Sequence, residues 1–487
     1  MDHLYIGIDL GTSSVKLSLV TPQGEIRKQT SRDYLVAYPE PKYAEQDPNI
    51  WWKETKFALK ELLMNIDSTL IKGISFGGQM HGLVILDIHD QVIRPCILWN
   101  DGRTEIETKY LNEVVGKEKL SMLTGNIAFA GFTAPKILWI QKHEPDHFRR
   151  IDKIMLPKDY LAYRFTGIFC SDFSDASGTL LFDVKNRTWS KEMCDLCDIS
   201  PSQLPEVLES CAVVGHIKGD LAKEFGLSSE VKIIIGGGDN AVAAIGTGAI
   251  AHGSCNISLG TSGTIFIASD EFIDDKKNAL HSFAHANGKY HLLGCILSAA
   301  SARSWWLENI LKTNDYARDE KEMDEANTTG LFFLPYLNGE RSPHNDVHAR
   351  GAFVGLTSQT TNKDMSKAIL EGVAFALRDC MEIAKENGVK IDYSTLCGGG
   401  SKSLIWRQIL ADVLNIQIRL LSTEQGPSFG AAILAMVGCR EYETLEVAIK
   451  HLIKVDSVVN PIGKNVLEYN DKYMTFKRIY PALKSIH

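Results

Sequence analysis

The sequence has no excess of basic residues. Its 487 residues include 52 Lys and Arg against 60 Asp and Glu, a formal net charge of −8, with both signs interspersed along the chain. A surface that binds duplex nucleic acid concentrates Lys and Arg on one face, and no such block occurs here. Nucleic acid and anionic membranes are therefore not expected as partners.

Features of exported and membrane proteins are also missing. The first residues, Met1 to Leu4, lack a basic stretch, and Asp9 interrupts the first apolar run. No window of about 18 uncharged apolar residues exists, so no transmembrane helix is expected. The ten cysteines are scattered over a long chain, which is typical of reduced thiols. We expect a cytoplasmic protein.

Several common nucleotide and metal motifs are absent. The chain has no GxxxxGK[ST] and no GxGxxG, which excludes a P-loop, a Rossmann fingerprint and the glycine loop of protein kinases. Residues 143–147 (His-Glu-Pro-Asp-His) place two His around a Glu, but Pro145 would break the helix that a zinc protease needs. Cys194 and Cys197 form a CxxC without a second pair, so no zinc site is expected.

Two similar hairpins lie half a chain apart. Residues 10–14 (Leu-Gly-Thr-Ser-Ser) and 259–263 (Leu-Gly-Thr-Ser-Gly) each lie between two strand-like segments. We interpret the pair as a duplication. Because a single core rarely grows beyond about 250–300 residues, we predict two α/β domains, 1–245 and 246–487. Ligands prefer domain interfaces, so a binding cleft is expected between them.

The two turns have the composition of a phosphate-binding loop. Gly, Thr and Ser offer backbone N–H groups and hydroxyls without bulk, which suits a phosphate chain. The alternative is an ordinary hairpin turn, which the repetition disfavours. The candidate residues are Thr12, Ser13, Gly260 and Thr261.

A glycine triplet gives the sharpest local signal. The β-branched segment 231–235 ends in Gly236, Gly237 and Gly238, and Asp239 follows at the expected start of a helix. An Asp at that place is held ionised by the helix dipole and by free N–H groups. It can accept the proton of a substrate hydroxyl that attacks phosphorus. The alternative is a capping Asp worth about 1 kcal/mol.

Asp9 ends the first predicted strand, directly before the first Gly-Thr-Ser turn. A carboxylate there can hold Mg²⁺, through water, opposite the β- and γ-phosphates of a nucleotide. The alternative is a turn Asp that bonds its own backbone. We favour the metal role.

A second glycine triplet follows the strand-like segment 393–396. Gly398, Gly399 and Gly400 precede a helix predicted to begin near Ser403. Such a turn fits a nucleoside at the helix start, although a tight strand–helix turn without a ligand is the alternative.

The remaining pattern is mixed. A helix is predicted over 51–64, a short strand over 73–76, and a long helix over 365–380 with Gly388 just past its end. About the last fifty residues are predicted to be helical and carry no chemical motif.

At these positions the chain resembles the FGGY carbohydrate kinases over nearly its whole length. Residues 7–13 (Gly-Ile-Asp-Leu-Gly-Thr-Ser) are similar to the phosphate-binding hairpin of the superfamily that includes actin and the heat-shock chaperone ATPases. Residues 132–139 (Phe-Thr-Ala-Pro-Lys-Ile-Leu-Trp) match one family signature, and 351–356 with 368–371 match the other. The motif positions show no departure from the family pattern.

The resemblance implies two duplicated actin-like, ribonuclease H-like ATPase domains that flank a central cleft and close on their ligands. It implies ATP and Mg²⁺ as cofactors, with sugar on the first domain and nucleotide on the second. The family's catalytic base is the Asp of the first glycine triplet, here Asp239. The residues implied near ATP and the metal are Thr12, Ser13, Gly260, Thr261, Gly399, Gly400 and Asp9.

Two segments, 78–82 (Gly-Gln-Met-His-Gly) and 97–103 (Ile-Leu-Trp-Asn-Asp-Gly-Arg), look like those of family members that act on xylulose. Residues 156–160 and 333–341 point the same way. Members that act on glycerol carry Arg-Glu where this chain has Met-His. The resemblance therefore implies a sugar site made by Met80, His81, Asp239 and Asn240. Without it, His81 would be interpreted as a satisfied loop or core histidine.

The expected reaction is transfer of a phosphoryl group from ATP to D-xylulose. One alternative is a family member that acts on ribulose, fuculose, gluconate or glycerol, which the Met-His pair disfavours. The other is an actin-like ATP switch that phosphorylates nothing. A homodimer is common in such kinases, but no feature of the sequence requires one.

Overall fold

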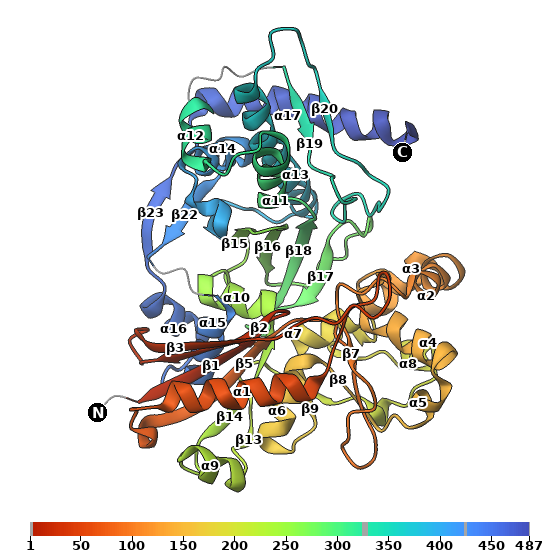
Figure 1. The fold of residues 1–487 in the computed structure, drawn as a ribbon, viewed down its shortest axis with the longest axis vertical. Coiled ribbons are helices and arrows are strands. Elements are labelled where there is room, and N and C mark those ends of the chain that lie inside the picture. Colours follow the sequence, from red (N-terminus) through yellow and green to blue (C-terminus); the bar gives the residue numbers. More distant parts are fainter. Residues whose placement is uncertain (1–2, 324–329, 423–425, 487) are drawn as a thin grey trace. The chain divides into compact units, whose positions relative to one another are not determined.

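The computed structural model describes residues 3–323, 330–422 and 426–486, and the chain forms two compact units. Unit 1 consists of Met1–Ile250, Ser282–Tyr290 and Gln425–Ile453, and unit 2 of the rest of the chain. Unit 1 is therefore discontinuous: helices α15 (Pro427–Gly438) and α16 (Leu445–Leu452) belong to it (Figure 1). The predicted division of the domains at residues 245 and 246 stays a prediction.

Unit 1 is built on a six-stranded sheet of order β13-β14-β5-β1-β2-β3. Its strands are β1 (Leu4–Leu10), β2 (Ser14–Val20), β3 (Ile26–Asp33), β5 (Ile71–Gly78), β13 (Val213–His216) and β14 (Lys232–Gly238). The helices before residue 250 are α1 (Pro48–Leu63), α2 (Glu105–Lys109), α3 (Lys117–Thr124), α4 (Thr133–His143), α5 (Pro145–Arg149), α6 (Pro157–Thr166), α7 (Phe173–Ala176), α8 (Lys191–Leu196), α9 (Gly219–Phe225) and α10 (Asp239–Thr247). Short strands complete the unit: β4 (Glu45–Gln46), β6 (Val84–Leu86), β7 (Cys96–Ile97), β8 (Lys153–Met155), β9 (Cys170–Asp172), β10 (Phe182–Asp183), β11 (Thr188–Trp189) and β12 (Glu206–Leu208).

Unit 2 contains a second large sheet, in which the order β18-β16-β15-β21-β22-β23 repeats that of unit 1. The strands of this seven-stranded sheet are β15 (Cys255–Leu259), β16 (Gly263–Ser269), β17 (His281–Ala284), β18 (Tyr290–Ile296), β21 (Tyr393–Cys397), β22 (Gln417–Leu421) and β23 (Val455–Val459), and β17 pairs with β18 at its edge. Strands β19 (Phe332–Leu334) and β20 (Ala352–Val354) form a separate two-stranded sheet. Its helices are α11 (Ala300–Ser304), α12 (Tyr316–Met323), α13 (Asn362–Glu386), α14 (Leu404–Leu414) and α17 (Gly463–Leu483).

Strand directions confirm the duplicated architecture. In unit 1, β1 runs antiparallel to β2 and parallel to β5, β5 runs parallel to β14, and β14 runs antiparallel to β13. In unit 2, β15, β16, β21, β22 and β23 have the same relations in the same order. The two Gly-Thr-Ser turns therefore occupy equivalent places, between β1 and β2 and between β15 and β16.

Register brings the functional candidates of unit 1 to one edge. Asp9 pairs with Gly77 across β1 and β5, and Gly77 pairs with Gly237 across β5 and β14. All three strands are parallel, so their carboxyl ends meet. Neighbouring strand ends therefore carry Asp9, Asp239 and the segment that follows Gly78.

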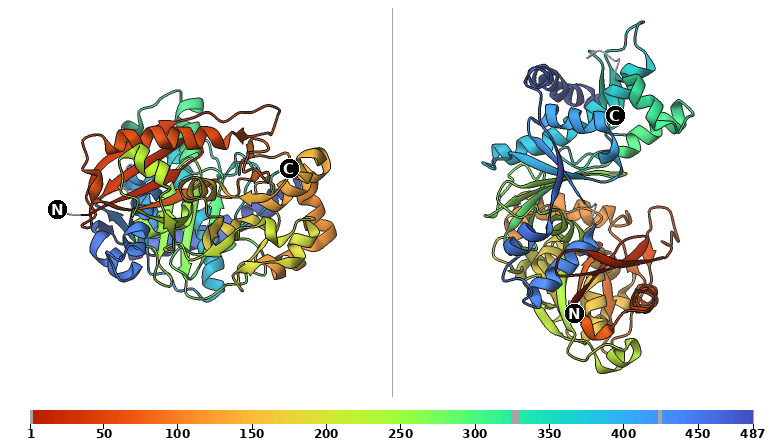
Figure 2. Two further views of the ribbon diagram at one scale, coloured as in Figure 1. Left: turned by 90° about the horizontal axis from the view of Figure 1, so that it is seen from below. Right: turned by 90° about the vertical axis from the view of Figure 1, so that its left-hand side faces the viewer.

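Small residues let helix α15 approach the first sheet closely. A Cβ on Gly7 would lie 1.8 Å from the Ser428 carbonyl oxygen, and one on Gly430 would lie 1.9 Å from the Val242 carbonyl oxygen. Helix α15 packs against β1, β2 and β5, and α16 packs against α15 and α10 (Figure 1). The other two views show the same late, blue part of the chain near the red strands of unit 1 (Figure 2). Gly7 thus allows α15 to lie directly on β1, and Gly430 allows α15 to lie directly on α10.

Most predicted elements are confirmed, with one error near the C-terminus. The predicted helices 51–64 and 365–380 correspond to α1 and α13, and Gly388 follows α13 with φ +89°. Pro145 does end one helix and begin the next. The last fifty residues are not wholly helical, because β23 pairs with β22 between two helices.

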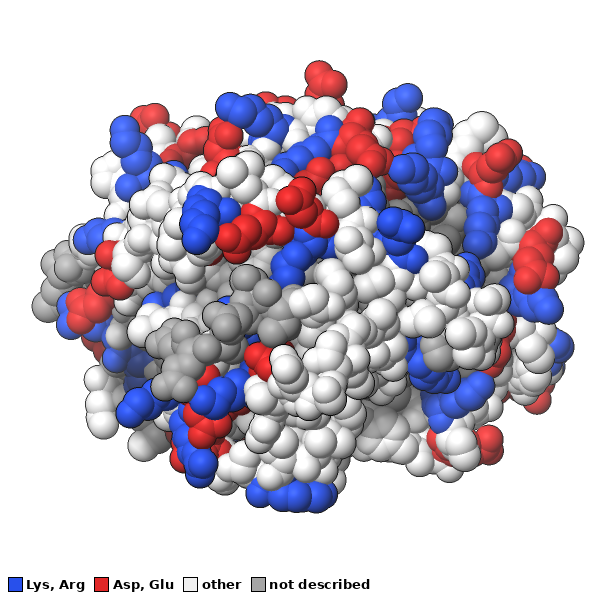
Figure 3. All heavy atoms as spheres, turned by 90° about the horizontal axis from the view of Figure 1, so that it is seen from above, with Lys and Arg blue, Asp and Glu red and all other residues white. Residues whose placement is uncertain are grey.

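The surface and the thiols agree with the composition. On the face drawn in Figure 3, Lys and Arg are intermixed with Asp and Glu and form no continuous basic field. No disulfide joins any of the ten cysteines. Within the described ranges, none of the helices combines the length and the apolar character needed to cross a bilayer.

Candidate active site

Asp239 is the first residue of α10, and Gly238 is its N-cap. Its Oδ1 accepts hydrogen bonds from the Asn240 backbone N (2.7 Å) and from Asn240 Nδ2 (2.9 Å). Burial raises the pKa of the Asp239 carboxyl to about 6, although the Asn240 backbone bond opposes this shift. A simple capping role does not describe this geometry, because glycine occupies the cap. A half-buried carboxylate that titrates just below neutral pH suits a general base.

Asp9 lies in the electrostatic field of Asp239. Burial, and then the charge of Asp239, raise the pKa of Asp9 to about 7, while Lys16 acts in the opposite direction. A bound cation would stabilise the ionised form of Asp9, which burial and the charge of Asp239 disfavour.

The predicted sugar contacts lie beside Asp239. Met80 Sδ lies 4.0 Å from Asn240 Nδ2, and a Cβ on Gly238 would lie 2.9 Å from Met80 Sδ. The structure thus brings Met80, Asp239 and Asn240 together in unit 1. Gly238 leaves the room that Met80 fills.

His81 is held by its neighbours in an uncommon backbone conformation. Its φ is +68°, its Nδ1–H donates to the Gly178 carbonyl oxygen (2.6 Å), and its ring stacks on Phe132 (4.6 Å between centroids). The His81 carbonyl oxygen accepts from Lys136 Nζ (2.7 Å) and Thr133 Oγ1 (3.1 Å). A non-glycine residue at positive φ costs on the order of 1 kcal/mol and persists where the surroundings fix it. The family-like segment 132–139 therefore supports the His81 loop.

The first Gly-Thr-Ser turn is tied to the same loop. The Thr12 hydroxyl donates to Gln79 Oε1 (3.2 Å) and accepts from Trp99 Nε1 (2.9 Å). Gln46 Nε2 donates to the Thr12 carbonyl oxygen (2.7 Å), and Gln79 Nε2 donates to Gln46 Oε1 (3.2 Å). Ser13 is exposed. The turn is thus held rigidly by polar side chains while Ser13 stays open to solvent.

Unit 2 brings its turn and its glycine triplet together. A Cβ on Gly398, whose φ is +85°, would lie 2.7 Å from the Leu259 carbonyl oxygen, so only glycine fits there. Gly400 packs on Leu259 and Trp406, whereas Gly399 has no heavy atom within 4 Å of such a Cβ. The turn that follows Leu259 and the glycine triplet therefore lie against each other, and the space beside Gly399 is open.

Helix α11 anchors the turn itself. The Gly260 carbonyl oxygen accepts from Ala300 N (2.9 Å), and the Thr261 carbonyl oxygen accepts from Ala299 N (3.0 Å) and Ser301 Oγ (2.7 Å). The Thr261 residue is exposed. A fixed backbone with an open side chain is the arrangement that a phosphate-binding turn requires.

Sequence reasoning missed a buried ion cluster behind these residues. Lys158 Nζ lies 2.5 Å from Asp159 Oδ1, 3.0 Å from Asp172 Oδ1 and 3.7 Å from Asp175 Oδ2. All four side chains are at most 1% exposed. Burial lowers and the three carboxylates raise the pKa of Lys158, with a net rise. Segment 156–160 (Leu-Pro-Lys-Asp-Tyr) gave the one signal, a Lys-Asp pair among apolar residues.

Family models match both halves of the chain. The N-terminal domain of the FGGY family of carbohydrate kinases matches residues 4–246, and the C-terminal domain of that family matches residues 255–439. The chain belongs to the FGGY family of carbohydrate kinases. The predicted fold, two ATPase-like α/β domains of the FGGY type, is confirmed.

Individual FGGY proteins extend this result. The chain is 41% identical to a xylulose kinase of Escherichia coli strain K12, over 99% of both chains. It is 40% identical to a xylulose kinase of Klebsiella pneumoniae, over 99% of this chain and 100% of that one. The crystal structure of a gluconate kinase from Lactobacillus acidophilus superposes with a TM-score of 0.95 at 28% identity, covering 99% of this chain and 98% of that chain. The FGGY fold thus serves more than one sugar.

Proposed function

We propose that this FGGY kinase transfers the γ-phosphoryl group of ATP to D-xylulose, giving ADP and D-xylulose 5-phosphate, with Asp239 as the general base. The observation that carries the proposal is the Asp239 carboxyl, which has a pKa of about 6 and lies beside Asn240 and Met80. Similarity to xylulose kinases along the whole chain supports the substrate.

In this proposal the chain's own groups bind, orient and deprotonate the sugar. Met80, His81 and Asn240 hold the sugar so that its terminal hydroxyl faces Asp239. The Asp239 carboxylate accepts the hydroxyl proton as the oxygen attacks phosphorus. Phosphoryl transfer needs little covalent help, so alignment and charge neutralisation supply most of the acceleration.

We propose that ATP lies mostly on unit 2. The exposed Thr261, Gly260 and the open backbone at Gly399 and Gly400 suit its phosphates and nucleoside. Thr12 and the exposed Ser13 of unit 1 would receive the γ-phosphate. The rigid Thr12 network would keep its backbone N–H groups oriented for that oxygen.

Asp9 fits a role in holding Mg²⁺. Its carboxyl is half-buried and faces the like charge of Asp239, which a divalent cation would offset. In the portion of the chain described, no three His, Cys, Asp or Glu side chains are arranged to hold a metal. This is the arrangement Mg²⁺ accepts, since it keeps waters and substrate phosphates as most of its ligands. Bound Mg²⁺ would neutralise charge on the phosphates.

The deciding experiment is ADP release by the purified protein with ATP and Mg²⁺ across five acceptors: D-xylulose, L-ribulose, L-fuculose, gluconate and glycerol. We expect a strong, selective rise with D-xylulose. Gluconate is the second candidate substrate, because the gluconate kinase structure matches this fold closely. Selective turnover of gluconate would keep Asp239 as the base and refute the xylulose assignment. A rate indifferent to every sugar would favour an ATP switch and refute both.

Two further expectations stay predictions. A homodimer is common in kinases of this family although the sequence does not require one, and sedimentation velocity at micromolar concentration tests for it. A cytoplasmic location is expected from the composition, and fractionation of the source cells tests it.

A further inference from the structure

We propose that Ser174 is a positioning residue that fixes Asp239 for catalysis, as part of a short segment that also holds His81. The segment runs from Asp172, at the end of β9, through α7 to Gly178. The inference rests on the proposed role of Asp239 as base. It assigns a function to residues that touch neither the sugar nor the nucleotide in the mechanism above.

Ser174 connects a buried carboxylate to the glycine triplet. Its backbone N and its Oγ both donate to Asp172 Oδ2, at 2.9 Å and 2.5 Å. Because the hydroxyl proton is committed to Asp172, a lone pair of Oγ faces the Gly238 backbone N, which donates to it at 3.1 Å. Gly238 directly precedes Asp239. The hydroxyl thus fixes the peptide from which the proposed base projects.

Close packing leaves this contact little freedom. A Cβ on Gly237 would lie 2.7 Å from Ser174 Oγ and 3.4 Å from Asp172 Oδ2. Ser174 and Asp172 are both fully buried. Gly237, the middle glycine of the triplet, therefore allows the close approach of Ser174, which a larger residue would block.

The other end of the segment supports the proposed sugar contacts. The Gly178 carbonyl oxygen accepts from His81 Nδ1 at 2.6 Å. A Cβ on Gly178 would lie 2.5 Å from His81 Cε1 and 3.1 Å from Met80 Cε. Only three residues separate Ser174 from Gly178. One short piece of chain consequently sets the spacing between the proposed base and the sugar-binding loop.

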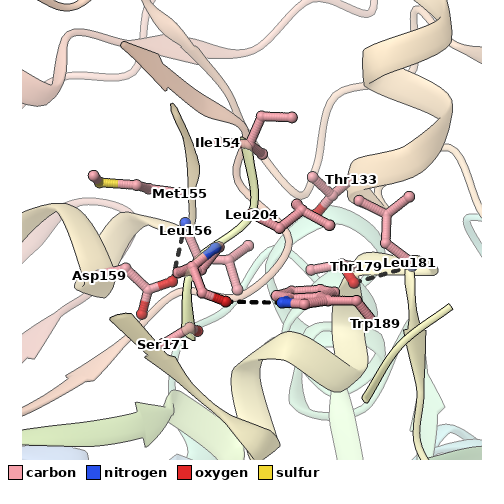
Figure 4. Close-up of a pocket in the computed structure, with 11 residues that line it drawn as sticks. Thr133, Ile154, Met155, Leu156, Asp159, Ser171, Thr179, Leu181, Trp189 and Leu204 are labelled. Atoms are coloured by element: carbon pink, nitrogen blue, oxygen red, sulfur yellow. Dashed lines mark hydrogen bonds between the residues drawn. The ribbon is translucent and has the colours of Figure 1, made fainter. Parts of the chain in front are cut away.

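The segment is anchored from behind by the Lys158 cluster. Asp172 uses Oδ1 for Lys158 and Oδ2 for Ser174 and Ser210, so its carboxylate cannot rotate without losing several bonds. Asp159 borders a small pocket with otherwise mostly apolar walls (Figure 4). In such surroundings charge pairing is strong, but buried ion pairs add little net stability. A role in fixing geometry explains why the cluster is there.

Ser174→Ala tests the proposal, with Ser210→Ala as its matched control. Ser210 Oγ also donates to Asp172 Oδ2 (2.7 Å) and is also buried, but no hydrogen bond joins it to Gly238 in the described part of the chain. We expect Ser174→Ala to lower kcat about tenfold with the KM for D-xylulose changed less than about twofold. Ser210→Ala should keep kcat within about twofold.

A double variant separates positioning from general damage. If Ser174 acts through Asp239, Ser174→Ala should lower kcat no further in an Asp239→Asn background. A full additional tenfold loss there, or equal kcat losses in the Ser174 and Ser210 variants, would overturn the positioning role alone. Normal turnover by Asp239→Asn would overturn the proposed base and this inference together.

Folding is checked by comparing the thermal unfolding midpoints of the two single variants. Should Ser174→Ala fail to fold, Ser174→Cys keeps a side chain of similar shape with a weaker acceptor. We expect that variant to lose less kcat than tenfold but more than Ser210→Ala. A kcat equal to that of Ser210→Ala would refute the positioning role.

Discussion

The two units of this FGGY kinase share one strand topology but differ in charge at an equivalent position, directly before the Gly-Thr-Ser turn. In unit 1 the strand before the Gly-Thr-Ser turn carries Asp9, whereas the equivalent residue in unit 2 is Ser258. The two glycine triplets are not equivalent, because Asp239 follows the triplet at the end of β14, whereas Ser401 follows the triplet after β21, the counterpart of β5. At the equivalent position before the Gly-Thr-Ser turn, unit 1 thus carries a carboxylate and unit 2 a neutral hydroxyl.

The difference suits a division of labour. A half that handles protons and a cation needs carboxylates with raised pKa values, as Asp9 and Asp239 have. A half that holds a polyphosphate needs neutral N–H and hydroxyl groups, because a carboxylate would repel the phosphates. The same turn can therefore serve two purposes once one side chain in each copy has changed.

The largest expected effect comes from removing the charge of the proposed base. Asp239→Asn keeps the shape of the side chain but cannot accept a proton. We expect kcat to fall by a factor on the order of 10²–10⁴, with a modest change in the KM for either substrate. Steady-state ADP release measures this, and Asn240→Asp at the adjacent position should not restore the rate. Near-normal turnover by this variant would refute the role of Asp239 as the general base.

The next effect tests unit 2 by giving it the charge of unit 1. Ser258→Asp places a carboxylate at the end of β15, where the proposed phosphate site begins. Repulsion should raise the KM for ATP about tenfold while the KM for the sugar stays constant. Ser258→Asn is the uncharged control and should change the KM for ATP by less than about twofold. Equal effects of the two variants would show that size, and not charge, matters there.

A pH profile sharpens the comparison further. Asp239 must be ionised to act as a base, and its pKa is about 6, so kcat/KM for the sugar should fall below about pH 6. The fall should approach tenfold per pH unit, measured at saturating ATP and Mg²⁺. The residual activity of Asp239→Asn should lack this inflection. An acid limb shared by both proteins would assign the titration to another group.

Much of this asymmetry could be predicted from the sequence. Asp239 stood out because a glycine triplet and a helix start surround it, and family resemblance identified Met80 and His81. The buried residues that hold Asp239, Met80 and His81 in position could not be predicted. Lys158, Asp172 and Ser210 are scattered in the chain and each looks like a surface residue until folding buries them together.

Tertiary packing also decided two features of the fold. Helix α15 packs closely in unit 1 because Gly7 and Gly430 allow it to approach β1 and α10, and no local sequence pattern predicts these contacts. Strand β23 (Val455–Val459) was missed because it has only five residues, too few to show a clear alternation of apolar and polar side chains. Its conformation depends on pairing with β22.

The smallest expected effect concerns stability. The pKa of Asp239 is about 6 in the folded protein, against about 3.9 for an unfolded Asp, so ionising it costs the folded state free energy. The cost is absent below about pH 4 and complete above about pH 6. Asp239→Asn should therefore raise the free energy of unfolding by at most roughly 3 kcal/mol at pH 7.5, with little gain at pH 4. Urea unfolding at both pH values measures this, with Ser258→Asn as the control in the neutral half. An equal gain at both pH values would show that altered packing, rather than loss of the buried charge, stabilises the Asp239→Asn variant.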